Sequence, residues 1–249
     1  MTTDDGYILS LWHVWKSGCE LTEHPVFLQH GLIDEGGTWF YNPGNKSLGL
    51  LLADECHDVW VGNSRGTVNS YRHVDPAMSE DSSAYWDFSF DEIGRYDLPA
   101  NIGFVRDHTK KDKVIYIGHS QGSIQFWIQN CLNDTFAKNI KAFGALSPIL
   151  YAGNQTSWFI DVQHKYQIWD FLYEHALTYF YFREGRNAFS NVVNALSPRL
   201  IQLFPRATWA IVGSLVGYNK EVKIDWSRFP VVSKNDVGGT GMTNMMHWV

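Results

Sequence analysis

The feature that most constrains the fold is a short apolar run that passes through a glycine-flanked serine into an amphipathic segment. Val114-Ile115-Tyr116-Ile117 lies between lysines and Gly118, which is typical of a buried parallel strand. After Ser120, apolar residues recur at helical spacing, at positions 124, 127, 128, 131 and 132. The sequence therefore predicts a strand that enters a helix through a tight turn at Ser120.

The rest of the first half also alternates between strand-like and helical stretches. Further strands are predicted at 7–15, from 26 to 28 leading into Gln29-His30-Gly31, at 59–61 and at 141–146. This alternation indicates an α/β fold, with a mostly parallel sheet, helices on its faces and ligands bound at the carboxyl ends of the strands.

The pattern changes after about Pro148, where aromatic-rich stretches at 169–183 and 196–215 favour helices. We therefore expect residues 1–147 to form the core and residues 148–249 to form a helical cap. The aromatic residues expected to line that cap are Trp158, Phe159, Trp169 and Phe171.

Composition excludes several functions. The chain is 45% hydrophobic with a formal net charge of −6, and its basic residues are scattered, so neither disorder nor nucleic-acid binding is expected. No apolar run reaches the length of a transmembrane helix, and the first residues lack the features of a signal peptide, which for an exported protein would lie outside this chain.

Three cysteines (Cys19, Cys56 and Cys131) allow at most one disulfide, and we expect no metal or cofactor. Three Asn-x-Ser/Thr sequons, at Asn45, Asn133 and Asn154, are compatible with a secreted glycoprotein.

Gly118-His119-Ser120-Gln121-Gly122 fits the G-x-S-x-G pattern, in which the glycines allow a sharp turn that exposes the serine hydroxyl. Such a hydroxyl needs a histidine base, and the oxyanion formed on attack needs N–H donors. The Gln121 backbone is one candidate donor, and Leu32, in the loop after an earlier strand, is the second. His30 is expected to shape that loop, because the base in folds with this motif follows late in the chain.

Several segments, in order along nearly the whole chain, resemble the acid-lipase family that includes gastric and lysosomal acid lipases. They are residues 3–9, 26–32, 47–49, 58–66, 88–92, 96–100, 118–122 and 244–248. The resemblance implies an α/β-hydrolase core with a helical cap and hydrolysis of ester bonds in neutral lipids at a lipid–water interface. It also implies Ser120 as nucleophile, Leu32 and Gln121 as oxyanion donors, and a secreted or lysosomal location. For residues 62–66 we expect a structural role.

The resemblance also predicts what this chain lacks. In the family the catalytic Asp and His follow the Asn-Met-x-His-Trp segment, and this sequence ends at Val249, just after Trp248. We therefore expect a fragment whose sheet is incomplete at its C-terminal edge and which is not by itself a competent hydrolase.

An internal triad is the alternative, with Asp225 or Asp236 followed by His247. A helix and a strand must fit between acid and base, and Pro230 and the glycines at 238, 239 and 241 disfavour both. His247 is instead expected where the chain returns from cap to core.

Two functions compete on this basis. One is a serine lipase or esterase that acts on acylglycerols or sterol esters through an acyl-enzyme on Ser120. The other is a catalytically inactive scaffold or binding subunit with the same fold. A longer transcript that encodes a strand-borne Asp and His after Trp248 would favour the enzyme.

Overall fold

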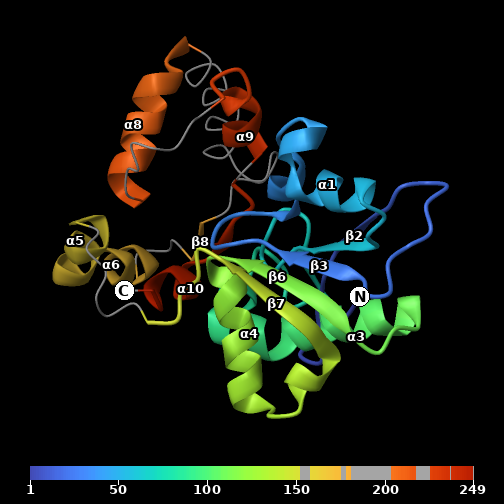
Figure 1. The fold of residues 1–249 in the computed structure, drawn as a ribbon. Coiled ribbons are helices and arrows are strands. Elements are labelled where there is room, and N and C mark those ends of the chain that lie inside the picture. Colours follow the sequence, from blue (N-terminus) through green and yellow to red (C-terminus); the bar gives the residue numbers. More distant parts are fainter. Residues whose placement is uncertain (152–157, 175–177, 181–202, 217–224, 236, 249) are drawn as a thin grey trace.

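A five-stranded sheet forms the centre of the computed structural model, which describes residues 1–151, 158–174, 178–180, 203–216, 225–235 and 237–248 (Figure 1). The strand order is β2-β4-β3-β6-β7, and only the β2–β4 pair is antiparallel. The strands are β2 (Leu11–Val14), β3 (Val26–Gln29), β4 (Val59–Gly62), β6 (Val114–His119) and β7 (Ile140–Leu146). The predicted α/β fold with a mostly parallel sheet is confirmed.

Helices connect the parallel strands and cover both faces of the sheet. Helix α1 (Leu48–Asp54) joins β3 to β4, α3 (Leu98–Thr109) precedes β6, and α4 (Gln121–Leu132) joins β6 to β7. The shorter helical turns of this half are η1 (Gly36–Phe40), η2 (Gly44–Lys46), η3 (Ser83–Trp86), α2 (Phe90–Glu92), the π-helix η4 (Ile93–Asp97) and η5 (Phe136–Asn139).

Strand β3 is buried on both faces because it lies in the middle of this sheet. Val26 and Leu28 join the apolar cluster that includes Ala53 of α1. Phe27 points to the other face, where it packs with residues of α3 and α4 such as Leu98 and Phe126. The continuous apolar run predicted for a parallel strand follows from this burial on both sides.

The single strand predicted at 7–15 was wrong, because this stretch forms two strands in different sheets. Strand β1 (Tyr7–Ile8) pairs with β5 (Arg72–His73) in a two-stranded sheet, and only β2 joins the central sheet. Between them, the Ser10 N–H donates to the Ser70 hydroxyl at 2.9 Å. This contact joins Ser10 to a residue distant in sequence, and no local pattern signals it.

The described residues after Leu146 add helices and no strand of the central sheet. These helices are α5 (Trp158–Tyr166), α6 (Ile168–Glu174), α8 (Pro205–Val216), α9 (Phe229–Asn235) and α10 (Met242–Met246). The helix predicted across 169–183 ends at Glu174, since Tyr179–Phe180 form β8, which pairs with β9 (Thr240–Gly241). The parts of the predicted helices at 181–183 and 196–202 lie outside the described residues.

Among the aromatic residues predicted to line the cap, the described side chains are largely exposed. Trp158 is 54% exposed, Phe171 is 57% exposed and Trp169 is half-buried, whereas the Phe159 side chain lies outside the description. The division into a core of residues 1–147 and a cap of residues 148–249 stays a prediction. In the described part, no helix is both long and apolar enough to cross a membrane.

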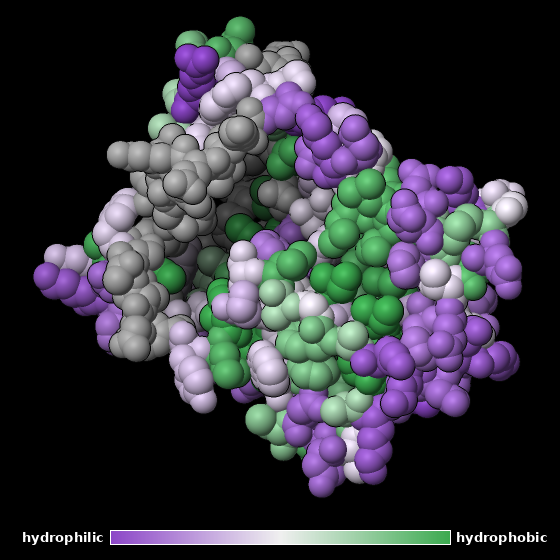
Figure 2. Space-filling view, viewed as in Figure 1, coloured by the Kyte–Doolittle hydropathy of each residue, from purple (hydrophilic) through white to green (hydrophobic). Residues whose placement is uncertain are grey.

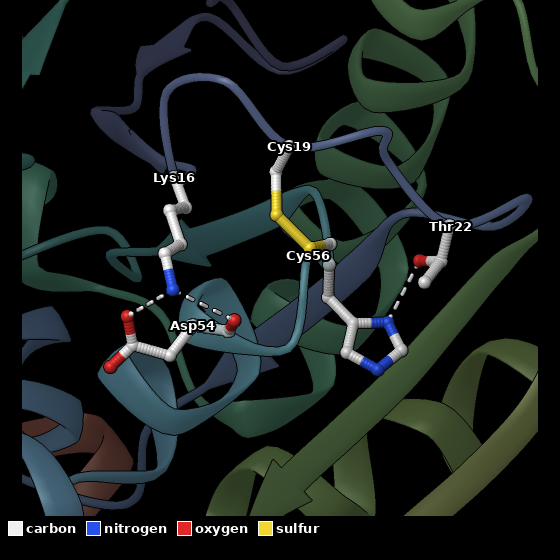
Figure 3. The surroundings of a disulfide bond; sticks show 6 residues. Lys16, Cys19, Thr22, Asp54 and Cys56 are labelled. Carbon is white, nitrogen blue, oxygen red and sulfur yellow. Dashed lines mark hydrogen bonds and ion pairs between the residues drawn. A yellow bond between two sulfur atoms is a disulfide. The ribbon is translucent and has the colours of Figure 1, made fainter.

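A disulfide joins Cys19 to Cys56 and ties the loop before β3 to the end of α1 (Figure 3). The same junction is held by the Thr22 N–H, which donates to the Cys56 carbonyl at 2.9 Å, and by the Thr22 hydroxyl next to the His57 ring. Cys131 is exposed and free. The limit of one disulfide set by the sequence is therefore reached.

The segment from Gly62 to Gly66 has the structural role expected of it. Arg65 is 1% exposed and lies between Asp97 and Asp5, with nitrogen–oxygen distances of 2.7 and 2.6 Å. Its guanidinium also covers the Tyr7 ring at 4.0 Å. The two carboxylates compensate the buried charge and fix the loop after β4 against the N-terminal strand.

Candidate active site

Ser120 occupies the sharp turn between β6 and α4 that the sequence predicted. Its backbone has φ 51° and ψ −119°, a conformation that costs on the order of 1–3 kcal/mol for a residue other than glycine. The turn is held because the Ser120 N–H donates to the Leu146 carbonyl at 2.9 Å. Crowding explains the flanking glycines: a Cβ on Gly122 would lie 2.6 Å from the Gln29 carbonyl oxygen, and one on Gly118 would collide with Gly122.

Buried hydroxyl groups anchor the first turn of α4. The Tyr116 hydroxyl donates to the Gly122 carbonyl at 2.6 Å, and burial raises the pKa of Tyr116 well above its ordinary value, so it remains a donor. The Ser123 hydroxyl donates to the Ser120 carbonyl at 2.6 Å and accepts from the Ile149 N–H at 3.2 Å. These bonds stabilise the strained turn from both sides.

The loop after β3 runs directly beside the turn. A Cβ placed on Gly31 would lie 3.1 Å from the Ser120 Cβ, so only glycine fits here without displacement. Two residues further on, Ile33 has φ 56°, which is a strained conformation for a β-branched side chain. Leu32 lies between these two positions, and its N–H therefore belongs to the backbone that borders Ser120.

His30 holds this loop in place and is not available as a base. Its Nδ1 lies 2.8 Å from the Gly31 carbonyl oxygen, and its Nε2 accepts the Ser64 N–H at 3.0 Å. Burial lowers the pKa of His30 to about 4, so the ring stays neutral near pH 7. This geometry agrees with the loop-shaping role predicted from the sequence.

Three polar groups at the turn have no hydrogen-bond partner among the described residues: the Ser120 hydroxyl and the N–H groups of Leu32 and Gln121. A hydroxyl beside backbone N–H donors is the arrangement that an acyl-transfer site requires. The assignment of these groups as nucleophile and oxyanion donors stays a prediction at this point.

Neither of the described residues considered for an internal triad, Asp225 and His247, makes a hydrogen bond to Ser120. The exposed His247 stacks on Phe90, with ring centroids 4.0 Å apart. Asp225 is exposed and accepts from the Ser227 hydroxyl at 2.6 Å, and Asp236 lies outside the described residues. The predicted place of His247 at the return from cap to core stays a prediction, like the division into cap and core.

An open depression of about 510 Å³ surrounds His247 and does not include Ser120, Leu32 or Gln121. Its lining is partly acidic and comprises Asp87, Phe88, Ser89, Glu92, Asp170, Thr243, Met246 and His247. Hydrogen bonds from the Ser89 N–H and hydroxyl, both 2.8 Å, lower the pKa of Glu92 although burial opposes them. We assign this depression no part in the chemistry at Ser120.

Sequence reasoning missed the residues that hold Gln121. The Gln121 Oε1 accepts from Asn244 Nδ2 at 3.1 Å and from Trp248 Nε1 at 2.9 Å. The segment at 244–248 was noticed for its family resemblance, but nothing local places it against a residue more than 120 positions away.

Comparison with known proteins gives two family matches. Residues 24–200 match the family described as alpha/beta hydrolase fold, and residues 1–43 match the one described as partial alpha/beta-hydrolase lipase region. Over its entire length the chain is 33% identical to human Lipase member J and covers 67% of that protein. Over 99% of its length it is 35% identical to human lysosomal acid lipase/cholesteryl ester hydrolase and covers 61% of it.

A third relative, gastric triacylglycerol lipase from Bos taurus, is 36% identical over 99% of the chain, which covers 61% of that lipase. The chain thus spans about two thirds or less of the length of these curated relatives.

Proposed function

The chain belongs to the α/β-hydrolase fold family and to the acid lipases within it, and we propose that it is a carboxylic ester hydrolase acting on neutral lipids, with Ser120 as its nucleophile. The observation that carries the proposal is the strained turn at Ser120, bordered by the N–H groups of Leu32 and Gln121, which have no hydrogen-bond partner among the described residues. The substrates proposed are acylglycerols or sterol esters, the classes that the names of two relatives give for those proteins.

The chemistry follows from this geometry. The Ser120 oxygen attacks the ester carbonyl, and its proton passes to a general base that then gives it to the departing alcohol, which leaves an acyl-enzyme. Water, deprotonated by the same base, attacks the acyl-enzyme and releases the carboxylic acid, and the proton returns to the Ser120 oxygen. In each tetrahedral intermediate the oxyanion accepts hydrogen bonds from the Leu32 and Gln121 N–H groups. Each such donor typically contributes about 100-fold to 1,000-fold in rate. His30 cannot serve as the base, since both of its ring nitrogens are engaged.

Exposed apolar side chains near the strand ends support an apolar substrate. Figure 2 shows hydrophobic residues at the surface of this face of the molecule, and at and just after the end of β7 the side chains of Leu146, Leu150 and Tyr151 are exposed. An acyl chain or a sterol could pack on such side chains and present its ester to the carboxyl ends of the strands, where ligands of α/β sheets bind. We propose that the substrate is taken from a lipid–water interface.

The disulfide supports a location outside the reducing cytosol. Structural disulfides persist in oxidising compartments, and the Cys19–Cys56 bond joins two segments of the core. A secreted or lysosomal location, inferred from the gastric and lysosomal relatives, is compatible with this bond. The secreted or lysosomal location remains part of the proposal.

Ester hydrolysis by purified variants tests the proposal in a version of the protein that also carries the general base, because without that base Ser120 attacks esters poorly. Every wild type and variant compared for ester hydrolysis carries it. We expect Ser120→Ala to fold normally and to lose p-nitrophenyl butyrate hydrolysis to below about a hundredth of wild type, because the nucleophile is gone. Ser83→Ala, which removes an exposed serine from η3, is the matched control and should keep full activity.

Equal hydrolysis by wild type and Ser120→Ala would remove Ser120 from the nucleophile role. A folded wild-type protein that hydrolyses no ester would instead favour the inactive scaffold.

A further inference from the structure

Residues 238–248 contact both of the backbone segments that carry the proposed oxyanion donors. At one end of this stretch, the Gly238 and Gly239 N–H groups donate to the Ile33 carbonyl at 2.7 and 3.3 Å. At the other end, Asn244 and Trp248 donate to the Gln121 side chain. The two donors come from loops that are distant in sequence, and this segment is bonded to both.

On the Gln121 side the contact fixes one orientation of the side-chain amide. Gln121 is 2% exposed, and its Oε1 accepts from two donors at once, so rotating the amide would turn an N–H₂ group towards both of them. Asn244 is fully buried and is anchored in turn by a 2.9 Å bond to the Thr240 hydroxyl. Because Gln121 is the first residue of α4, holding its side chain also holds its backbone N–H.

On the Leu32 side the contact holds a strained loop. Ile33, the residue directly after Leu32, has φ 56°. Its carbonyl oxygen accepts hydrogen bonds from the Gly238 and Gly239 N–H groups. Gly238 approaches so closely that a Cβ there would collide with the Asp34 carbonyl. The Gly238 carbonyl in turn accepts from the Val68 N–H at 2.8 Å, which ties the contact to the core.

We propose that residues 238–248 are a positioning brace for the oxyanion hole, with Gly238, Asn244 and Trp248 acting as positioning residues through Ile33 and Gln121. The inference rests on the proposed function for its catalytic meaning. The placement of the two amides can be measured without catalysis.

Backbone amide signals of the ¹⁵N-labelled chain provide the first readout. Trp248→Phe keeps an aromatic ring beside Phe90 but removes the donor to Gln121, and it should shift the Gln121 amide signal and speed its hydrogen exchange at least tenfold. Asn244→Asp removes the Nδ2 donor to Gln121, while its carboxylate can accept from the Thr240 hydroxyl in place of the present Asn244 Nδ2 donation, and it should act in the same direction. The Leu32 amide should change little in both variants.

Gly238→Ala tests the Leu32 side of the brace. It should shift the backbone amide signals of Leu32 and Ile33 and leave the Gln121 amide signal nearly unchanged. Thr243→Ala is the matched control on α10, since its hydroxyl faces Asp87 and makes no contact with either loop. Unchanged Leu32 and Gln121 amides in all three test variants, or equal changes in the Thr243→Ala control, would overturn the brace.

Kinetics provide the second readout. For p-nitrophenyl butyrate, Trp248→Phe and Gly238→Ala should each lower kcat about tenfold and leave KM within about twofold, because an oxyanion donor acts mainly in the transition state. If the substitutions only destabilised the fold, they would lower the unfolding temperature without lowering kcat selectively over KM. If wild type hydrolyses no ester, the proposed function fails, and the amide signals alone decide whether the brace exists.

Discussion

His30 should make the stability of this protein depend on pH between about 7 and 4. Its ordinary pKa of 6.5 applies in the unfolded chain, and burial lowers the pKa to about 4 in the folded protein. Between these values the unfolded state binds more protons, so stability rises with pH and is lost as pH falls towards 4. One pKa unit corresponds to about 1.4 kcal/mol, so protonation of His30 should cost about 3 kcal/mol of unfolding free energy.

Urea unfolding at pH 7 and pH 4 measures this loss in wild type and in His30→Gln. The glutamine cannot be protonated, and its side-chain oxygen can still accept the Ser64 N–H, so the variant should lose about 3 kcal/mol less than wild type over this pH range. His164→Gln, which removes an exposed histidine from α5, is the control and should follow wild type. An equal loss in wild type and His30→Gln would refute the claim that His30 is buried and neutral.

Three further perturbations test other parts of the account. Arg65→Met should destabilise the chain by about 3–5 kcal/mol in urea unfolding, because it leaves the buried Asp97 without its partner, and a loss below about 1 kcal/mol would contradict this. Gly31→Ala should reduce ester hydrolysis at least tenfold with little change in unfolding temperature, since the new Cβ crowds Ser120 at 3.1 Å; unchanged rates would show that the loop yields freely. His247→Ala should leave ester hydrolysis unchanged, because this side chain stacks on an aromatic ring in a separate depression, and loss of activity would identify His247 as the base.

The parts of the fold that could be predicted from the sequence are those with a local cause. The turn at Ser120 is set by its neighbouring glycines and by the apolar run before it, and β3 is set by burial on both faces. The split of the strand predicted at 7–15 could not be foreseen, since β1 pairs with the distant strand β5 and Ser10 bonds to Ser70, 60 positions away.

In the candidate site, too, the residues with a local sequence signal could be predicted, and those that depend on distant contacts could not. Ser120 and Leu32 were predicted from motifs that are contiguous in the sequence, and the structure places Gly31 beside Ser120. The contacts of Asn244 and Trp248 with Gln121 could not be predicted, because periodicity and propensity carry no information about pairings between distant polar side chains.

The most direct test of the central claim is the site at which a fluorophosphonate ester becomes covalently attached, identified by mass spectrometry of the digested protein. Such a reagent mimics the tetrahedral intermediate and bonds to a serine that is exposed and bordered by oxyanion donors. The account predicts a single adduct on Ser120, absent from Ser120→Ala and slower to form in Gly31→Ala. An adduct on another residue, or none on a folded protein that also carries the general base, would contradict it.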